Sequence, residues 1–135
     1  FLNPSHNSYE RFGSFEAPKY ISWSHQNRSQ LIRIPAQGGE YARMELRSPD
    51  STCNPYIAFA LLIYAGLEGI REKAVLPEPV DENLFENAEA REGLRVLPGN
   101  LYEAVETMRK SSFVRPELPE STVDKFVDTV IKRKD

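Results

Sequence analysis

The chain has 135 residues, a formal net charge of −3 and a single cysteine. Hydrophobic residues make up 40% and charged residues 27%, close to the average for globular domains, so the composition argues against a disordered protein. The length suffices for one domain or less with a real core. An acidic chain is a poor candidate for a reader of the nucleic-acid backbone, which normally carries a basic domain, and no nucleic-acid partner is expected.

The cysteine count and the apolar stretches indicate the cellular compartment of the protein. A single cysteine, Cys53, excludes an internal disulfide and fits a reducing compartment. The longest apolar stretch, residues 56–67, is too short to span a bilayer, and no signal-peptide pattern opens the chain. The sequence therefore predicts a cytoplasmic protein with no membrane partner. Because Phe1 is not a methionine, we expect the chain to be a fragment of a longer reading frame.

The first part of the chain, residues 1–52, is predicted to be rich in strands. Residues 1–20 combine turn signals with aromatic side chains, which is typical of an ordered loop. Short strands are predicted at residues 20–24 and 31–34. A glycine-containing turn at residues 37–40 then leads into a strand at residues 42–46.

The second part, residues 53–135, is predicted to be helical. Asn54 and Pro55 mark a helix start, as N-cap and first helical residue, and the helix runs to about Lys73. It is apolar almost all round, which predicts that its neighbours bury it. Further helices are predicted at residues 101–110 and from Pro119 onward. The predicted fold class is α+β, with antiparallel strands backed by about three helices.

Five arginines lie in the first 47 residues, and three charged residues alternate along one predicted strand. Side chains two apart on a strand share a face, so Arg43, Glu45 and Arg47 lie together, with the two arginines about 13 Å apart. That spacing suits two anionic groups with a cation between them. A solvated sheet face with cross-strand ion pairs is the ordinary alternative. Arg28 and Arg33 favour an external anion, because the planar guanidinium matches phosphate or carboxylate.

Five motifs follow one another in order: Asn3-Pro4 with Asn7-Ser8-Tyr9 and Arg11, Phe15-Glu16-Ala17-Pro18, Asn27-Arg28-Ser29 with Ile32-Arg33-Ile34-Pro35, Arg43, Glu45 and Arg47 before Pro49-Asp50, and Asn54-Pro55-Tyr56. In this order and spacing they resemble the C-terminal part of the catalytic domain of class I glutamine synthetases. This resemblance implies a glutamate–ammonia ligase that uses ATP, forms a γ-glutamyl phosphate intermediate and needs Mg²⁺ or Mn²⁺. It also implies a homo-oligomer, a dodecamer when the protein is full length.

The resemblance assigns two residues to catalysis and four to binding of glutamate. Glu16 is similar to the loop glutamate that closes the site and helps to take a proton from ammonium. Arg28 is similar to the residue that faces the transferred phosphoryl group, where a fixed positive charge stabilises the equatorial oxygens. Arg11 and Arg47 resemble glutamate-binding arginines, with Arg47 on the α-carboxylate, and Glu16 and Arg28 also belong to this glutamate site.

The resemblance also assigns residues to the binding of the nucleotide and of the metal. Arg28, Arg33 and Arg43 resemble contacts to the ATP phosphates. Glu45 resembles a carboxylate ligand of a hard Mg²⁺ or Mn²⁺ ion. The family's remaining metal ligands lie in sequence outside this chain, from which we expect the isolated chain to be inactive.

Three departures from the family pattern stand out. The loop between Arg11 and Glu16 is one residue shorter than the common version. Glu40 stands near the place where many members have an ATP-contacting lysine, and Phe85 stands where the enterobacterial enzymes present the tyrosine that is adenylylated. Two alternatives to the ammonia ligase stay open: a glutamate–amine ligase of the same fold, such as a γ-glutamylpolyamine synthetase, and a non-catalytic glutamine-synthetase-like protein.

Overall fold

The computed structural model describes residues 1–14, 17–35 and 38–132. These residues form two compact units, each built from segments that are distant in the sequence. Among them, a helical unit comprises residues 1–10, 50–76 and 98–132, and a sheet unit comprises residues 11–14, 17–35, 38–49 and 77–97. The α+β class predicted from the sequence is confirmed.

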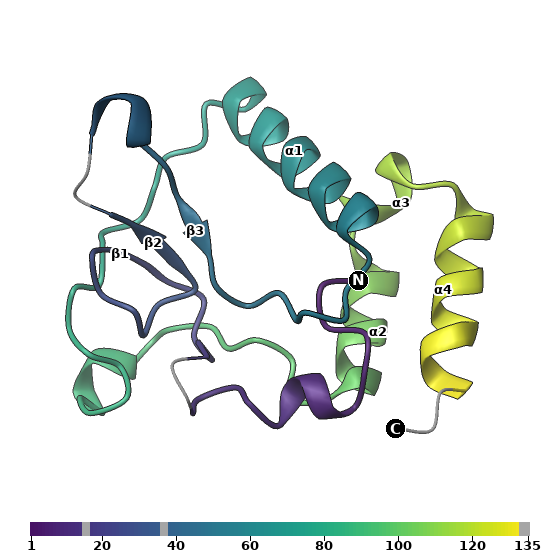
Figure 1. Cartoon of the computed structure of the whole chain (residues 1–135), viewed down its shortest axis with the longest axis horizontal. Coiled ribbons are helices and arrows are strands. Elements are labelled where there is room, and N and C mark those ends of the chain that lie inside the picture. The colour runs from purple at the N-terminus through teal and green to yellow at the C-terminus, as the bar shows by residue number, and fades with distance from the viewer. Residues whose placement is uncertain (15–16, 36–37, 133–135) are drawn as a thin grey trace. The chain divides into compact units, whose positions relative to one another are not determined.

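The sheet unit contains three short strands, β1 (Trp23–His25), β2 (Ile32–Ile34) and β3 (Glu45–Leu46), in the order β1-β2-β3 (Figure 1). The antiparallel pairing of β2 with β3 agrees with the prediction. The pairing of β1 with β2 is parallel, so the expectation of a purely antiparallel sheet is wrong. Parallel neighbours need a crossover, and here residues 26–31 return the chain to the start of β2.

The third strand is shorter than predicted. Residues 42–44 lie outside it, and Gly39–Tyr41 form a 3₁₀ helix, η2, where a hairpin-like turn was expected. Gly39 has a φ of 68°, a left-handed conformation that glycine adopts without a steric penalty. Gln37, part of the predicted turn, lies outside the described residues. A second 3₁₀ helix of this unit, η3 (Glu89–Arg91), follows the buried Leu84.

The helical unit begins with a 3₁₀ helix, η1 (Asn7–Tyr9), and contains four α-helices. They are α1 (Pro55–Arg71), α2 (Leu101–Lys110), α3 (Val114–Glu117) and α4 (Glu120–Lys132). Asn54 caps α1 as predicted, because its side chain accepts hydrogen bonds from the backbone N–H groups of Tyr56 and Ile57. No helix among the described residues is long and apolar enough to cross a membrane.

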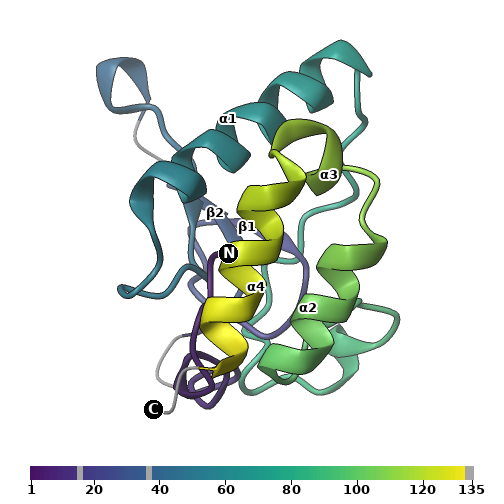
Figure 2. The ribbon, with the colours of Figure 1, turned by 90° about the vertical axis from the view of Figure 1, so that its right-hand side faces the viewer.

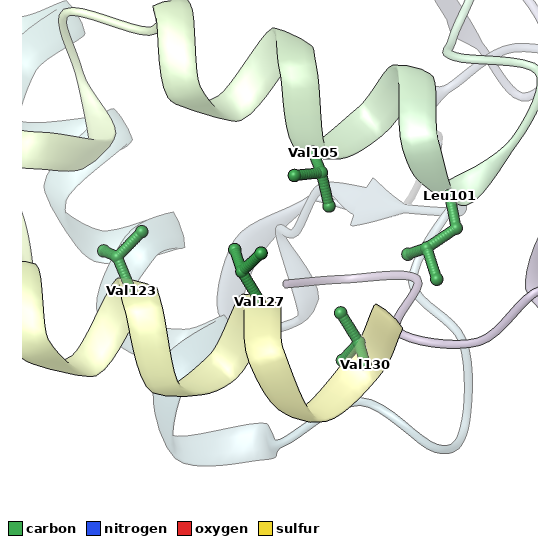
Figure 3. Packing of buried hydrophobic residues seen from close by; sticks show 5 residues of the cluster. All are labelled: Leu101, Val105, Val123, Val127 and Val130. Carbon is green, nitrogen blue, oxygen red and sulfur yellow. The ribbon is translucent and has the colours of Figure 1, made fainter. Parts of the chain in front are cut away.

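The apolar core of the helical unit lies between α2 and α4, which run side by side (Figure 2). Each helix is amphipathic, and its apolar stripe faces the other helix. Figure 3 shows that the core side chains of the two helices point toward one another. Its fully buried members are Leu101, Val105, Val123, Val127 and Val130.

Helix α1 is far more exposed than its composition predicts. Only Ala58 and Leu61 are buried along its 17 residues. The sequence-based expectation that neighbours surround this helix is therefore wrong for this chain. Large apolar side chains on it remain 40–84% exposed, namely Tyr56, Phe59, Ile63, Tyr64, Leu67 and Ile70.

Candidate functional site

Glu45 lies between two guanidinium groups on the sheet unit. Its Oε2 accepts a hydrogen bond from Arg33 Nη1 at 2.8 Å, and its Oε1 accepts one from Arg43 Nη2 at 3.2 Å. The hydrogen bond from Arg33, with the charges of Arg33 and Arg43, holds the pKa of Glu45 below its usual value. The Arg33–Glu45 contact is the cross-strand ion pair that the sequence left open as the alternative to an external anion.

The antiparallel register explains the shorter of these two contacts. Arg33 on β2 is directly opposite Glu45 on β3, so their side chains leave the sheet on the same face. Arg33 also donates from Nε to the carbonyl oxygen of Gln26 at 2.7 Å. Gln26 has a φ of 70°, and its turn follows β1 directly. Arg33 thus joins the end of β1 to the carboxylate on β3.

Two of the arginines assigned to glutamate, Arg11 and Arg47, are linked by a hydrogen bond from the Arg11 side chain to the backbone next to Arg47. Arg11 Nη2 donates to the carbonyl oxygen of Ser48, which directly follows Arg47. The backbone N–H of Arg47 donates to Leu31 O at 2.9 Å, which continues the pairing beyond β3. Ser48 is 4% exposed, so this junction is well packed.

Arg28 lies in the connection between β1 and β2, and its side chain is exposed while Ser29 and Gln30 beside it are buried. Arg28 thus presents an exposed side chain directly before two buried residues and after the half-buried Asn27. Glu16, the remaining predicted catalytic residue, lies outside the described residues.

The residues described here do not form a complete divalent-metal site. Within residues 1–14, 17–35 and 38–132, no three His, Cys, Asp or Glu side chains gather in a way that could hold an ion. Mg²⁺ is held by several oxygen ligands, and both carboxylate oxygens of Glu45 already accept hydrogen bonds from guanidinium groups. The described part of the chain therefore offers one candidate metal carboxylate and no complete metal site.

The structure brings together Arg33, Arg43 and Glu45, and separately links Arg11 to the backbone beside Arg47. Sequence reasoning missed the polar residues that hold the Arg28 segment in place, above all Gln30, which is completely buried. The pattern Asn27-Arg28-Ser29 contained a usable signal, because an Asn side chain commonly bonds the backbone N–H two residues later.

Comparison with known proteins identifies the family. The family described as "Glutamine synthetase, catalytic domain" matches residues 1–135. Curated glutamine synthetases from Methanosarcina mazei and Thermotoga maritima are 49% and 48% identical to the chain, over 93% and 96% of its length. The glutamine synthetase of Methanococcus voltae is 40% identical over 98% of the chain. The chain spans 29–31% of the length of these relatives.

A solved structure shares the fold as well. It is described as "GmaS/ADP complex-Conformation 1", and it superposes with a TM-score of 0.82 at 29% identity. The match covers 96% of the chain and 30% of the solved chain. With the family match along its whole length and these relatives, the chain belongs to the glutamine synthetase family and corresponds to part of its catalytic domain.

Proposed function

We propose that the full-length protein containing this chain is a glutamate–ammonia ligase, and that the chain supplies most of the cationic side of its active site. The observation that carries the proposal is the Arg33–Glu45–Arg43 arrangement on a chain that matches the catalytic domain of glutamine synthetases. A carboxylate between guanidinium groups suits a reaction that handles both phosphates and a metal.

In this proposal two pairs of arginines bind two different anionic substrates. Arg33 and Arg43 bind the phosphates of ATP, and Arg11 and Arg47 bind the carboxylate groups of glutamate, because the planar fork of arginine pairs with either anion. The clamps hold the γ-carboxylate of glutamate near the γ-phosphate of ATP. Attack of a carboxylate oxygen on the γ-phosphorus, with ADP as the leaving group, is then effectively intramolecular.

Arg28 has the distinct role of stabilising the transferred phosphoryl group. Charge spreads over the equatorial oxygens as the group moves, and a fixed guanidinium lowers the energy of that state. Ammonia then displaces phosphate from the γ-glutamyl carbon, with Glu16 taking the surplus proton of ammonium. Glu45 is proposed as one carboxylate of an Mg²⁺ or Mn²⁺ site whose other ligands come from outside this chain.

The cellular location, the oligomeric state and the small-molecule partners of the enzyme are part of the same proposal. The single cysteine supports a cytoplasmic location, since reducing compartments keep thiols unpaired. Family membership supports a homo-oligomer, a dodecamer when the protein is full length, with ATP, glutamate and ammonia as its small-molecule partners.

The test is an assay of ATP hydrolysis coupled to product detection. The full-length protein should form glutamine from glutamate, ATP and ammonia, and other amines, polyamines included, should be poorer substrates. The isolated 135-residue chain should form none, because it carries a single candidate metal carboxylate. A full-length protein that prefers another amine would identify a glutamate–amine ligase, and one without any turnover would indicate a non-catalytic relative.

A further inference from the structure

The residues on both sides of Arg28 are hydrogen-bonded to a segment that lies 54 and 55 positions later in the chain. On one side, Asn27 Nδ2 donates to the carbonyl oxygen of Asp81 at 2.9 Å. On the other side, the backbone N–H of Leu84 donates to Ser29 Oγ at 2.8 Å. Arg28 is therefore an exposed residue held between two anchored neighbours.

A buried amide strengthens the attachment. Gln30 is 0% exposed, its Nε2 donates to the carbonyl oxygen of Glu82 at 2.8 Å, and its Oε1 accepts from Ser29 Oγ at 3.0 Å. Buried polar groups stabilise a structure only when they are hydrogen-bonded, and a fully connected network specifies one arrangement of the chain. Segment 81–84 supplies the partners that this network needs.

The beginning of the loop is held by the same segment. The Asp81 carboxylate accepts a hydrogen bond from the backbone N–H of His25 at 2.9 Å, and its second oxygen lies 3.6 Å from His25 Nδ1. Asn27 Oδ1 accepts from the backbone N–H of Ser29 at 2.9 Å, which closes a turn around Arg28. Every contact named here lies within the sheet unit.

We propose that segment 81–84, acting through Asn27, Ser29 and Gln30, is a positioning element that fixes the Arg28 guanidinium for phosphoryl transfer. The inference rests on the proposed role of Arg28. A charge that is already in place when the transition state forms needs no reorganisation, and such precision requires support from surrounding hydrogen bonds. None of the supporting residues needs to touch a substrate, so each is a positioning residue.

Limited proteolysis of the 135-residue chain tests whether segment 81–84 holds the backbone around Arg28, and it needs no assay of enzyme activity. Trypsin cleaves after Arg28 only when the surrounding backbone opens, and the cleavage rate follows the population of the open form. Lys73, exposed in the connection after α1, serves as an internal reference site. Ser29→Ala and Asn27→Ala should raise cleavage after Arg28 by about tenfold or more and leave cleavage after Lys73 unchanged.

The matched control is Thr52→Ala, which removes a hydroxyl that donates to Asp50 Oδ1 at 2.7 Å outside the sheet unit. It should leave the Arg28 site protected. Asn27 is only half-buried, so its variant tests the inference even if the buried Ser29 tolerates no change. Unchanged cleavage after Arg28 in a folded Asn27→Ala chain, or equal increases at Arg28 and Lys73, would overturn the proposal.

A double-mutant cycle in the full-length protein tests the functional part. Ser29→Ala should lower kcat about tenfold with little change in the glutamate KM, and in an Arg28→Ala background it should add almost no further loss. If instead the losses in kcat of the two single variants multiply in the double variant, Ser29 does not act through Arg28. If the full-length protein has no ligase activity, the proposed function fails, and the proteolysis result still decides whether segment 81–84 fixes the Arg28 loop.

Discussion

Arg33 and Glu45 face each other across the antiparallel pair β2–β3, with guanidinium nitrogen and carboxylate oxygen 2.8 Å apart. Arg43 approaches the second oxygen of the same carboxylate from the residues just before β3. A divalent ion at Glu45 would compete with these contacts, because it would be the largest positive charge beside the carboxylate.

Glu45→Gln should remove the charge while leaving the fold of the chain intact. The lowered pKa of Glu45 means that the folded state favours its ionised form, so this residue contributes stability above its ordinary pKa of 4.5 and loses that contribution as the pH falls through the lower folded value. Thermal denaturation should show the wild type modestly more stable near neutral pH, with the difference shrinking below about pH 4.5.

Glu106→Gln is the matched control, since it breaks an exposed ion pair with Arg109 within α2. It should have little effect on the denaturation temperature, because exposed pairs contribute little. A Glu45→Gln variant that is equally stable at every pH would contradict the pairing. In the full-length protein the same change should weaken metal-dependent binding of ATP.

Arg28→Lys in the full-length protein should reduce kcat by about 10²-fold and raise the glutamate KM far less. Lysine keeps the charge but lacks the planar fork that reaches two oxygens at once. Steady-state kinetics with varied glutamate measures both parameters. Arg95→Lys, at another exposed arginine of the sheet unit, should leave them unchanged. An effect confined to KM would assign Arg28 to ground-state binding of the substrate.

A leucine-to-alanine substitution in the core between α2 and α4 should destabilise the chain more than the same substitution on the exposed helix α1. Leu101 is 2% exposed, and Leu101→Ala should cost about 2–5 kcal/mol in the free energy of unfolding, because it removes buried methyl groups and leaves a cavity. Leu67 on α1 is 49% exposed, so Leu67→Ala should cost clearly less. Denaturant titration of both variants checks the comparison, and equal costs would contradict the burial of Leu101.

Local signals predicted some parts of the fold well. The boundaries of α2 match those expected from the sequence, and α1 begins at Pro55 behind its Asn54 cap. The pairing of Glu45 with Arg33 matches the cross-strand ion pair that the sequence left open as an alternative. The roles of Arg11, Arg28 and Arg47 in catalysis or binding came from family resemblance, and they stay predictions.

Other features depend on distant parts of the chain and could not be predicted. The loop between the parallel strands β1 and β2 is held by distant partners. Asn27 donates to the carbonyl oxygen of Asp81 and Ser29 Oγ accepts from the backbone N–H of Leu84, and no pattern near the strands encodes these contacts. The prediction that α1 is buried was wrong for a related reason. Its composition shows that the helix needs apolar neighbours, but periodicity does not show whether those neighbours lie within the same 135 residues.

The exposed apolar face of α1 predicts that the isolated chain self-associates. Tyr56, Phe59, Ile63, Leu67 and Ile70 are 84%, 64%, 62%, 49% and 76% exposed, and such contiguous apolar surface favours association. Since the chain spans 29–31% of the length of its relatives, we expect other parts of the full-length protein to cover this face. Analytical ultracentrifugation of the isolated chain should show oligomers that dissociate on dilution.

The double variant Phe59→Glu/Ile63→Lys should shift the isolated chain toward the monomer and preserve its helical circular dichroism signal, because both side chains are exposed and the charges lie four residues apart on one helix. Val75→Glu is the control: Val75 is 94% exposed but lies outside α1, so a charge there should leave association unchanged. A wild-type chain that is monomeric at all concentrations would refute the prediction. In the full-length protein the double variant should instead lower stability, because there the same side chains would be buried against the remainder of the protein.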